Sequence, residues 1–208
     1  MHFKHTVTSE YELRSLLGTP SKTAANKTIH HLDIHCKEFI SKTPIVFIST
    51  SDTSGHCDTS PRGDEPGFIH IIDNHNFVIP ERPGNKRMDS LRNIIANPHI
   101  GLLFVIPGLE ETLRINGTAK IIRDPDILKK MTSHGKTPML GIAVQVEECY
   151  IHCAKAFKRS KLWQPDSWTQ KSALPYPPKI LADHINMPDI NSETIKAALD
   201  ESYSKRLY

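Results

Sequence analysis

Positive charge is concentrated in one short loop near the middle of the chain. The stretch PERPGNKRMDSL, residues 80–91, places Asn85, Lys86 and Arg87 directly before an apolar helical pattern. A helix N-terminus exposes unpaired N–H groups and the positive end of the helix dipole, so cations in its first turn are unfavourable. A bound phosphate would reverse that effect, and we therefore expect a phosphate site where a helix begins with these cations. The alternative is a solvated basic turn with Asp89 as its counterion.

Two further pairs of side chains could bind an anion. Ser60 and Arg62 lie at the end of an expected strand, where a guanidinium beside a hydroxyl is a common anion clamp. A surface ion pair between Arg62 and Asp64 is the alternative. Arg114 and Asn116 are two residues apart in the stretch TLRINGTA, so they lie on one face of a strand. That face borders either a binding groove or solvent.

A third group of candidates lies near residue 160. Lys155, Arg159 and Trp163 recur every four residues, so in a helix they would share one face. Two cations beside an indole suit a planar anionic ligand, and they equally suit cation–π contacts on a surface. Spacing alone leaves both interpretations open.

The chain lacks the motifs of several common enzyme sites. It contains neither HExxH nor a paired CxxC, so we expect no metal site. A GxSxG elbow, a GxGxxG loop and a P-loop are also missing, so a bound phosphate would be held in another way. These absences leave the catalytic residues unassigned.

Composition indicates a globular protein rather than a nucleic-acid or membrane binder. The 208 residues include 26 basic and 23 acidic side chains, for a net charge of +3. A nucleic-acid-binding protein usually carries a larger excess of positive charge. No apolar stretch is long enough to predict a membrane span, and no apolar run near the N-terminus predicts a secretory signal. The four cysteines lack paired spacing, so we expect reduced thiols in the cytoplasm.

The elements that must position these residues indicate a mainly β fold with added helices. Short turns join most of the expected strands, and long helices do not alternate with them. This pattern favours a mostly antiparallel barrel of about six strands over a doubly wound parallel sheet. We expect a helical segment at 1–43, the barrel at 44–163, and a C-terminal extension at 164–208 that ends in a helix.

Ordered motifs strengthen the prediction of an anion site. SPRGD, PGNKRMDSL and LRINGTA occur in that order, followed by HCAKAFKRSKLW, within the region from Cys36 to Trp163. Together they resemble an uncharacterised bacterial branch of the pyridoxamine 5'-phosphate oxidase-like superfamily. The resemblance implies a six-stranded antiparallel split β-barrel that forms a homodimer, with FMN at the dimer interface.

The resemblance also implies roles for the candidate residues. Those expected to bind FMN are Ser60, Arg62, Asn85, Lys86, Arg87, Arg114, Asn116, Lys155, Arg159 and Trp163. The members before residue 90 would make the anion and phosphate contacts. The next two would contact the flavin from the partner subunit, and the last three would approach the edge of the flavin ring.

The implied function is that of an FMN-dependent oxidoreductase that acts on a small molecule, with NAD(P)H as a candidate electron donor. The oxidases proper carry an RxxxLK phosphate motif and a C-terminal RLHDR segment. Here CDTSPRGD replaces the first and the second is absent, which argues against vitamin B6 oxidase activity. The alternatives are a non-enzymatic flavin carrier and a split barrel that uses F420 or haem.

Overall fold

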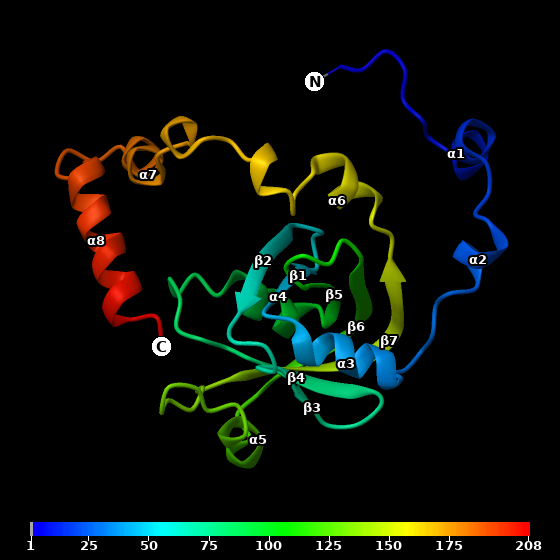
Figure 1. Ribbon diagram of the computed structural model, residues 1–208, viewed down its shortest axis with the longest axis horizontal. Helices are drawn as coiled ribbons and strands as arrows, with labels where there is room; N and C mark the ends of the chain where they lie inside the picture. The colour runs from blue at the N-terminus through cyan, green and yellow to red at the C-terminus, as the bar shows by residue number, and fades with distance from the viewer. Residues whose placement is uncertain (1) are drawn as a thin grey trace.

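A curved antiparallel sheet forms the body of the protein (Figure 1). The computed structural model describes residues 2–208. Its seven strands are ordered β2-β1-β5-β6-β7-β4-β3, and every neighbouring pair is antiparallel. They are β1 Ile45–Ser51, β2 Cys57–Gly63, β3 His70–Ile71, β4 Asn76–Pro80, β5 His99–Val105, β6 Thr112–Ile122 and β7 Gly141–His152. The expected split barrel with added helices is confirmed, and the strand count is seven because the short β3 pairs with β4.

Alternating side chains explain how the sheet encloses a core. In β1, Val46 and Ile48 are fully buried, whereas Phe47 between them points outward. The longest ladder joins β6 and β7 and contains an irregularity at Asn116 and Gly117. A Cβ atom on Gly117 would lie 2.0 Å from the carbonyl oxygen of Gln145, so only glycine fits there. Strands β6 and β7 therefore approach each other closely next to Asn116.

Three helices pack against the barrel: α3 Ile34–Lys42, α4 Asp89–Ala96 and α5 Pro125–Lys129. Asp33 caps α3 by accepting a hydrogen bond from the Cys36 N–H at 2.8 Å. Helix α4 buries Leu91 and Ile94 against β1 and β6. This packing holds the N-terminus of α4 beside β2, which it also contacts.

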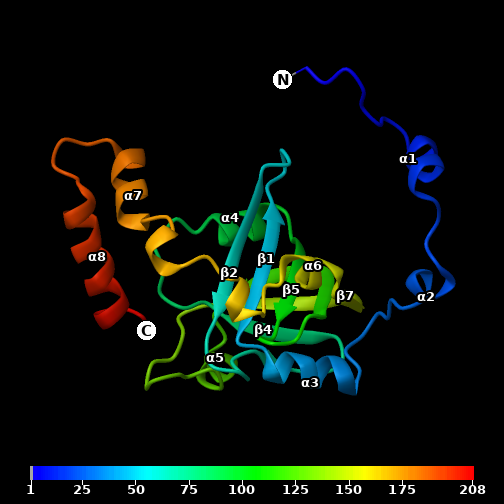
Figure 2. The same ribbon diagram turned by 45° about the horizontal axis from the view of Figure 1, so that its top comes forward.

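The remaining helices lie in the segments before and after the sheet: α1 Glu10–Leu17, α2 Lys22–Ala25, α6 Lys155–Ser160, α7 Pro177–Ile185 and α8 Ser192–Lys205, with short 3₁₀ turns η1 Pro165–Ser167 and η2 Lys171–Ala173. Helices α1 and α2 bury no residue and extend away from the barrel (Figures 1 and 2). Helix α7 packs on α8, and the chain then returns to the barrel at its C-terminal end (Figure 1). Across residues 2–208, the structure contains no helix that is both long and apolar enough to span a membrane.

Candidate functional site

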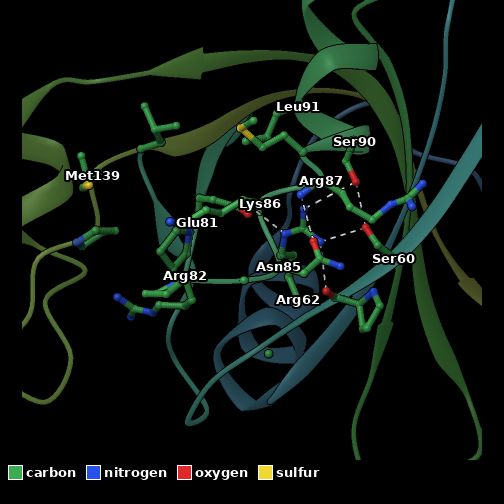
Figure 3. Close-up of a pocket in the computed structure, with 18 of the residues that line it drawn as sticks. Ser60, Arg62, Glu81, Arg82, Asn85, Lys86, Arg87, Ser90, Leu91 and Met139 are labelled. Atoms are coloured by element: carbon green, nitrogen blue, oxygen red, sulfur yellow. Dashed lines mark hydrogen bonds and ion pairs between the residues drawn. The ribbon is translucent and has the colours of Figure 1, made fainter. Parts of the chain in front are cut away.

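A cavity of about 940 Å³ lies where β2, the end of β4 and the N-terminus of α4 meet (Figure 3). The loop at 81–88, the segment at 136–140 and the C-terminal residues 207–208 complete its lining. The predicted FMN-binding residues that line it are Ser60, Arg62, Asn85, Lys86 and Arg87, which we term the cavity group. The structure thus brings together two motifs that lie about twenty residues apart in the sequence.

Strand β2 aims alternate side chains at the cavity. Asp58, Ser60 and Arg62 are half-buried and line it, whereas Thr59 is exposed and outside the lining and Pro61 is exposed at its edge. This arrangement follows from the two-residue period of a β-strand. The same period could have identified Asp58, which is missing from the predicted set. One strand therefore supplies a carboxylate, a hydroxyl and a guanidinium to the same site.

Two hydroxyls and a guanidinium converge at the floor of the cavity (Figure 3). Arg62 Nη1 donates to Ser60 Oγ at 2.8 Å, and Ser60 Oγ lies 2.8 Å from Ser90 Oγ. Ser90, in the first turn of α4, donates in turn to Asp58 Oδ2 at 2.5 Å. Ser90 is buried and is missing from the predicted set. Its place in the motif PGNKRMDSL is the sequence signal that could have identified it. The network fixes the Arg62 guanidinium in position before any ligand binds.

The other edge of that guanidinium is held by a carboxylate. Arg62 Nε donates to Glu81 Oε2 at 2.9 Å, and both side chains are largely shielded from solvent. The surface pair considered between Arg62 and Asp64 does not form. Asp64 instead pairs with Arg82 at 2.7 Å, and Glu81 and Arg82 both line the cavity without any sequence motif that indicates them.

The loop before α4 differs from the sequence prediction. Lys86 and Met88 adopt left-handed backbone angles, with φ of 62° and 59°, and α4 begins only at Asp89. Left-handed residues cannot continue a right-handed helix, so the expected basic first turn is wrong. The two cations precede the helix instead, and the Asn85 side chain accepts a hydrogen bond from the Arg87 N–H at 3.0 Å. Non-glycine residues in this conformation are uncommon and often occur at functional sites.

Charge neutralisation differs among the three cations of the cavity group. Glu81 neutralises Arg62, and Asp89 pairs with Arg87 at 2.8 Å, which raises the pKa of Arg87. None of the ion pairs within residues 2–208 involves Lys86. The first turn of α4 adds backbone N–H groups, because its N-cap residue Met88 has no side-chain capping bond. The combination favours a compact anion over a neutral ligand.

The other predicted residues lie outside the cavity lining; we term Arg114, Asn116, Lys155, Arg159 and Trp163 the outer group. Arg114 and Asn116 do share the outward face of β6, as the spacing predicts. The Arg114 guanidinium lies over the Tyr150 ring at 5.7 Å, and Asn116 Nδ2 donates to Glu148 Oε2 at 3.0 Å. In the single chain these side chains therefore contact their neighbours on β7.

The expected helical face that joins Lys155, Arg159 and Trp163 is wrong. Helix α6 ends at Ser160, and the next residue, Lys161, is left-handed with φ of 53°. Trp163 instead stacks on Phe157 at 5.8 Å and donates its indole N–H to the carbonyl oxygen of Leu109 at 2.9 Å. The indole thus anchors the segment after β7.

Comparison with known proteins gives one family match. The model of the family described as Pyridoxamine 5'-phosphate oxidase matches residues 32–153, a region that includes the whole sheet and the cavity group. No curated protein matches the chain.

Solved structures with a similar fold share little sequence with this chain. HupZ from Group A Streptococcus is 21% identical, with a TM-score of 0.47 over 58% of this chain and 93% of that one. A putative pyridoxamine 5'-phosphate oxidase from Lactobacillus delbrueckii is 18% identical, with a TM-score of 0.47 over 60% and 98%. HutZ from Vibrio cholerae, described as a heme storage protein, is 13% identical, with a TM-score of 0.42 over 58% and 93%.

Proposed function

This chain belongs to the pyridoxamine 5'-phosphate oxidase family, and from that premise we propose that it is an FMN-dependent oxidoreductase. The observation that carries the proposal is the convergence of Arg62 with the hydroxyls of Ser60 and Ser90 at the floor of the cavity. We further propose a cytoplasmic homodimer that acts on a small organic molecule.

The cavity group fits the phosphate end of FMN. A phosphate monoester carries a charge of about −1.5 to −2 near neutral pH and accepts several hydrogen bonds. The Ser90 hydroxyl donates to Asp58 and the Ser60 hydroxyl to Ser90, so the two hydroxyls orient the Arg62 guanidinium, which supplies positive charge already in place. Lys86 adds a positive charge without a carboxylate partner among the described residues. Charge-assisted hydrogen bonds of this kind are the strong ones, so these residues would set most of the affinity for the phosphate.

The proposal assigns the outer group to the flavin ring, through a second copy of the chain. Bound FMN would supply hydride transfer, which leaves negative charge on one edge of the reduced ring. A cation at that edge stabilises the reduced form. Arg114, Lys155 and Arg159 are the candidates for that role, with Asn116 and Trp163 as neighbouring contacts. Because none of them lines the cavity of its own chain, a partner subunit would have to bring them to the ring.

The cavity favours FMN over haem as the cofactor. Haem iron is held by histidine, cysteine or tyrosine, or by methionine together with histidine. The described residues that line the cavity include no histidine or cysteine, so Met88 and Met139 have no histidine beside them, and the Tyr208 phenol donates to Asp64. A cavity with cations and hydroxyls on one side matches a phosphorylated organic cofactor instead.

Absorption spectroscopy and mass analysis of the purified protein test this proposal. We expect a flavin spectrum and the mass of FMN, either as isolated or after FMN is added. NADH or NADPH should then bleach the spectrum, and air or an organic acceptor should restore it with repeated turnover. A bound flavin that is inert to both donors would instead indicate a carrier, and the spectrum of F420 or of haem would indicate another cofactor. A protein that retains no flavin after incubation with excess FMN and removal of the unbound cofactor would refute the proposal.

A further inference from the structure

The C-terminal end of the chain is fastened to the barrel by three contacts of Tyr208. Its phenol donates a hydrogen bond to Asp64 Oδ1 at 2.8 Å. Its ring lies 4.2 Å from the His134 ring, centroid to centroid, and its backbone oxygen accepts from Lys136 Nζ at 2.6 Å. The three partners come from two segments that lie far from residue 208 in the sequence. Tyr208 therefore joins the end of the chain to both segments at once.

One ion pair, between Asp64 and Arg82, links the contacts of Tyr208 to the side of the cavity that carries the cations. The Asp64 side chain is only 2% exposed and pairs with Arg82 at 2.7 Å. Arg82 lies in the loop that continues to Lys86 and Arg87, and its guanidinium lies 6.0 Å from the Tyr208 ring centroid. Tyr208 thus packs against both ends of the Asp64–Arg82 pair, at the base of the cation-bearing loop.

Large apolar side chains form another part of the same cavity. Leu207, Met88 and Met139 line it and remain 61%, 55% and 86% exposed. Figure 3 shows Met139 on the opposite side of the cavity from Ser60. Exposed apolar side chains gathered at one concave site are typical of a surface that binds an apolar group. The cavity therefore has cations and hydroxyls that suit an anion on one side and apolar side chains on the other.

We propose that Leu207 and Tyr208 form a wall of the ligand site that selects a phosphate ester whose uncharged ring or chain has an apolar side. Leu207, with Met88 and Met139, contacts the apolar part, and Tyr208 is the positioning residue that holds the wall in place. The inference rests on the proposed function in one respect, namely that the anionic end of the ligand binds at Ser60 and Arg62.

Binding measurements on tail variants test this wall. We expect Leu207→Asp to weaken FMN binding about tenfold more than inorganic phosphate binding, because the new carboxylate repels both anions but removes an apolar contact only from FMN. Tyr208→Phe removes only the phenol hydroxyl and should weaken FMN binding less. It should also speed amide hydrogen exchange in residues 203–208. The matched control is Tyr203→Phe, since Tyr203 is an exposed tyrosine of α8 outside the cavity lining.

A second probe separates this inference from the proposed function. The dye 8-anilinonaphthalene-1-sulfonate joins an anion to aromatic rings, so it should fluoresce in the cavity and be displaced by inorganic phosphate. If the natural sequence binds the dye but not FMN, the proposed function fails and the wall is still tested by the loss of dye binding in Leu207→Asp. If Leu207→Asp binds FMN and the dye as tightly as the natural sequence does, the inference is overturned. The same holds if sedimentation shows a changed oligomeric state and the binding of both probes stays the same.

Discussion

Arg62 of the cavity group and Arg114 of the outer group carry the same charge, but the structure places them in different environments. In the cavity group, Arg62 is locked between Ser60 and Glu81 and is largely shielded from solvent. In the outer group, Arg114 is an exposed side chain that lies over a tyrosine ring. Enclosed charges interact more strongly with a ligand because less water screens them. Arg62 is thus enclosed and held in place, whereas Lys86 and Arg87 of the cavity group and Arg114, Lys155 and Arg159 of the outer group are exposed.

The largest expected effect comes from removing the central cation of the cavity group. Arg62→Ala should weaken FMN binding about 100-fold, because charge-assisted hydrogen bonds are lost and Glu81 is left facing the phosphate. Isothermal titration of FMN measures this, with Arg123→Ala as the control, since Arg123 is exposed and outside the cavity lining. An unchanged dissociation constant in Arg62→Ala would mean that the phosphate binds elsewhere.

A second prediction concerns the stability of β6, the strand that carries Arg114 and Asn116. Gly117→Ala should lower the free energy of unfolding by about 2 kcal/mol, because the new methyl group meets the Gln145 carbonyl beside the irregularity of β6. Gly84→Ala in the cavity loop is the control, since no atom lies within 4 Å of its Cβ position. Urea denaturation measures both. Equal stabilities would show that the outward face of β6 does not depend on this close approach.

The third prediction tests whether the outer group reaches the flavin from a partner subunit. Arg114→Ala should weaken FMN binding about fivefold, and Lys120→Ala on the same strand should not. Sedimentation in parallel shows whether the dimer persists. If a stable dimer of Arg114→Ala binds FMN with unchanged affinity, the contact assigned to Arg114 is wrong. The cavity group alone would then account for FMN binding.

The smallest expected effect concerns the ion pair that borders the cavity. Burial raises the pKa of Asp64, but hydrogen bonds from Tyr208 and the Glu65 N–H and the charge of Arg82 outweigh it and lower the pKa overall. A lowered pKa means that the ionised form stabilises the fold above the unfolded-state value and that this contribution is lost as the pH falls through the folded value. Unfolding of the natural sequence should therefore become easier below about pH 4.

Asp64→Asn is the test of that ion pair. It should flatten part of this acid dependence in thermal unfolding measured at a series of pH values. Asp126→Asn, at an exposed aspartate of α5, should retain the full dependence. Identical acid profiles for the natural sequence and Asp64→Asn would remove the ion pair from the account.

Local sequence patterns predict the sheet and the five predicted residues that line the cavity. The two-residue period of β2 places Ser60 and Arg62 on one face, and alternation in β6 does the same for Arg114 and Asn116. The start of α4 is mispredicted because left-handed angles at a lysine carry no composition signal, unlike those at glycine.

Long-range partners are the part that the sequence does not show. Glu81 pairs with Arg62 across 19 residues, and Tyr208 reaches Asp64 across 144 residues. Such contacts depend on how the strands and the C-terminal segment fold back on one another, and no local period encodes them. The same limit explains why the four-residue spacing of Lys155, Arg159 and Trp163 is misleading, since Trp163 bonds to Leu109 across 54 residues.

The central claim is that the cavity group binds the phosphate of FMN, and comparison of FMN with riboflavin tests it most directly. Riboflavin has the same ring system without the phosphate. The account predicts that the natural sequence binds FMN at least 100-fold more tightly than riboflavin, that the difference largely disappears in Arg62→Ala, and that it narrows when Lys86→Ala and Arg87→Ala are combined. Equal affinities for the two flavins, or a preference for FMN that survives Arg62→Ala unchanged, would contradict it.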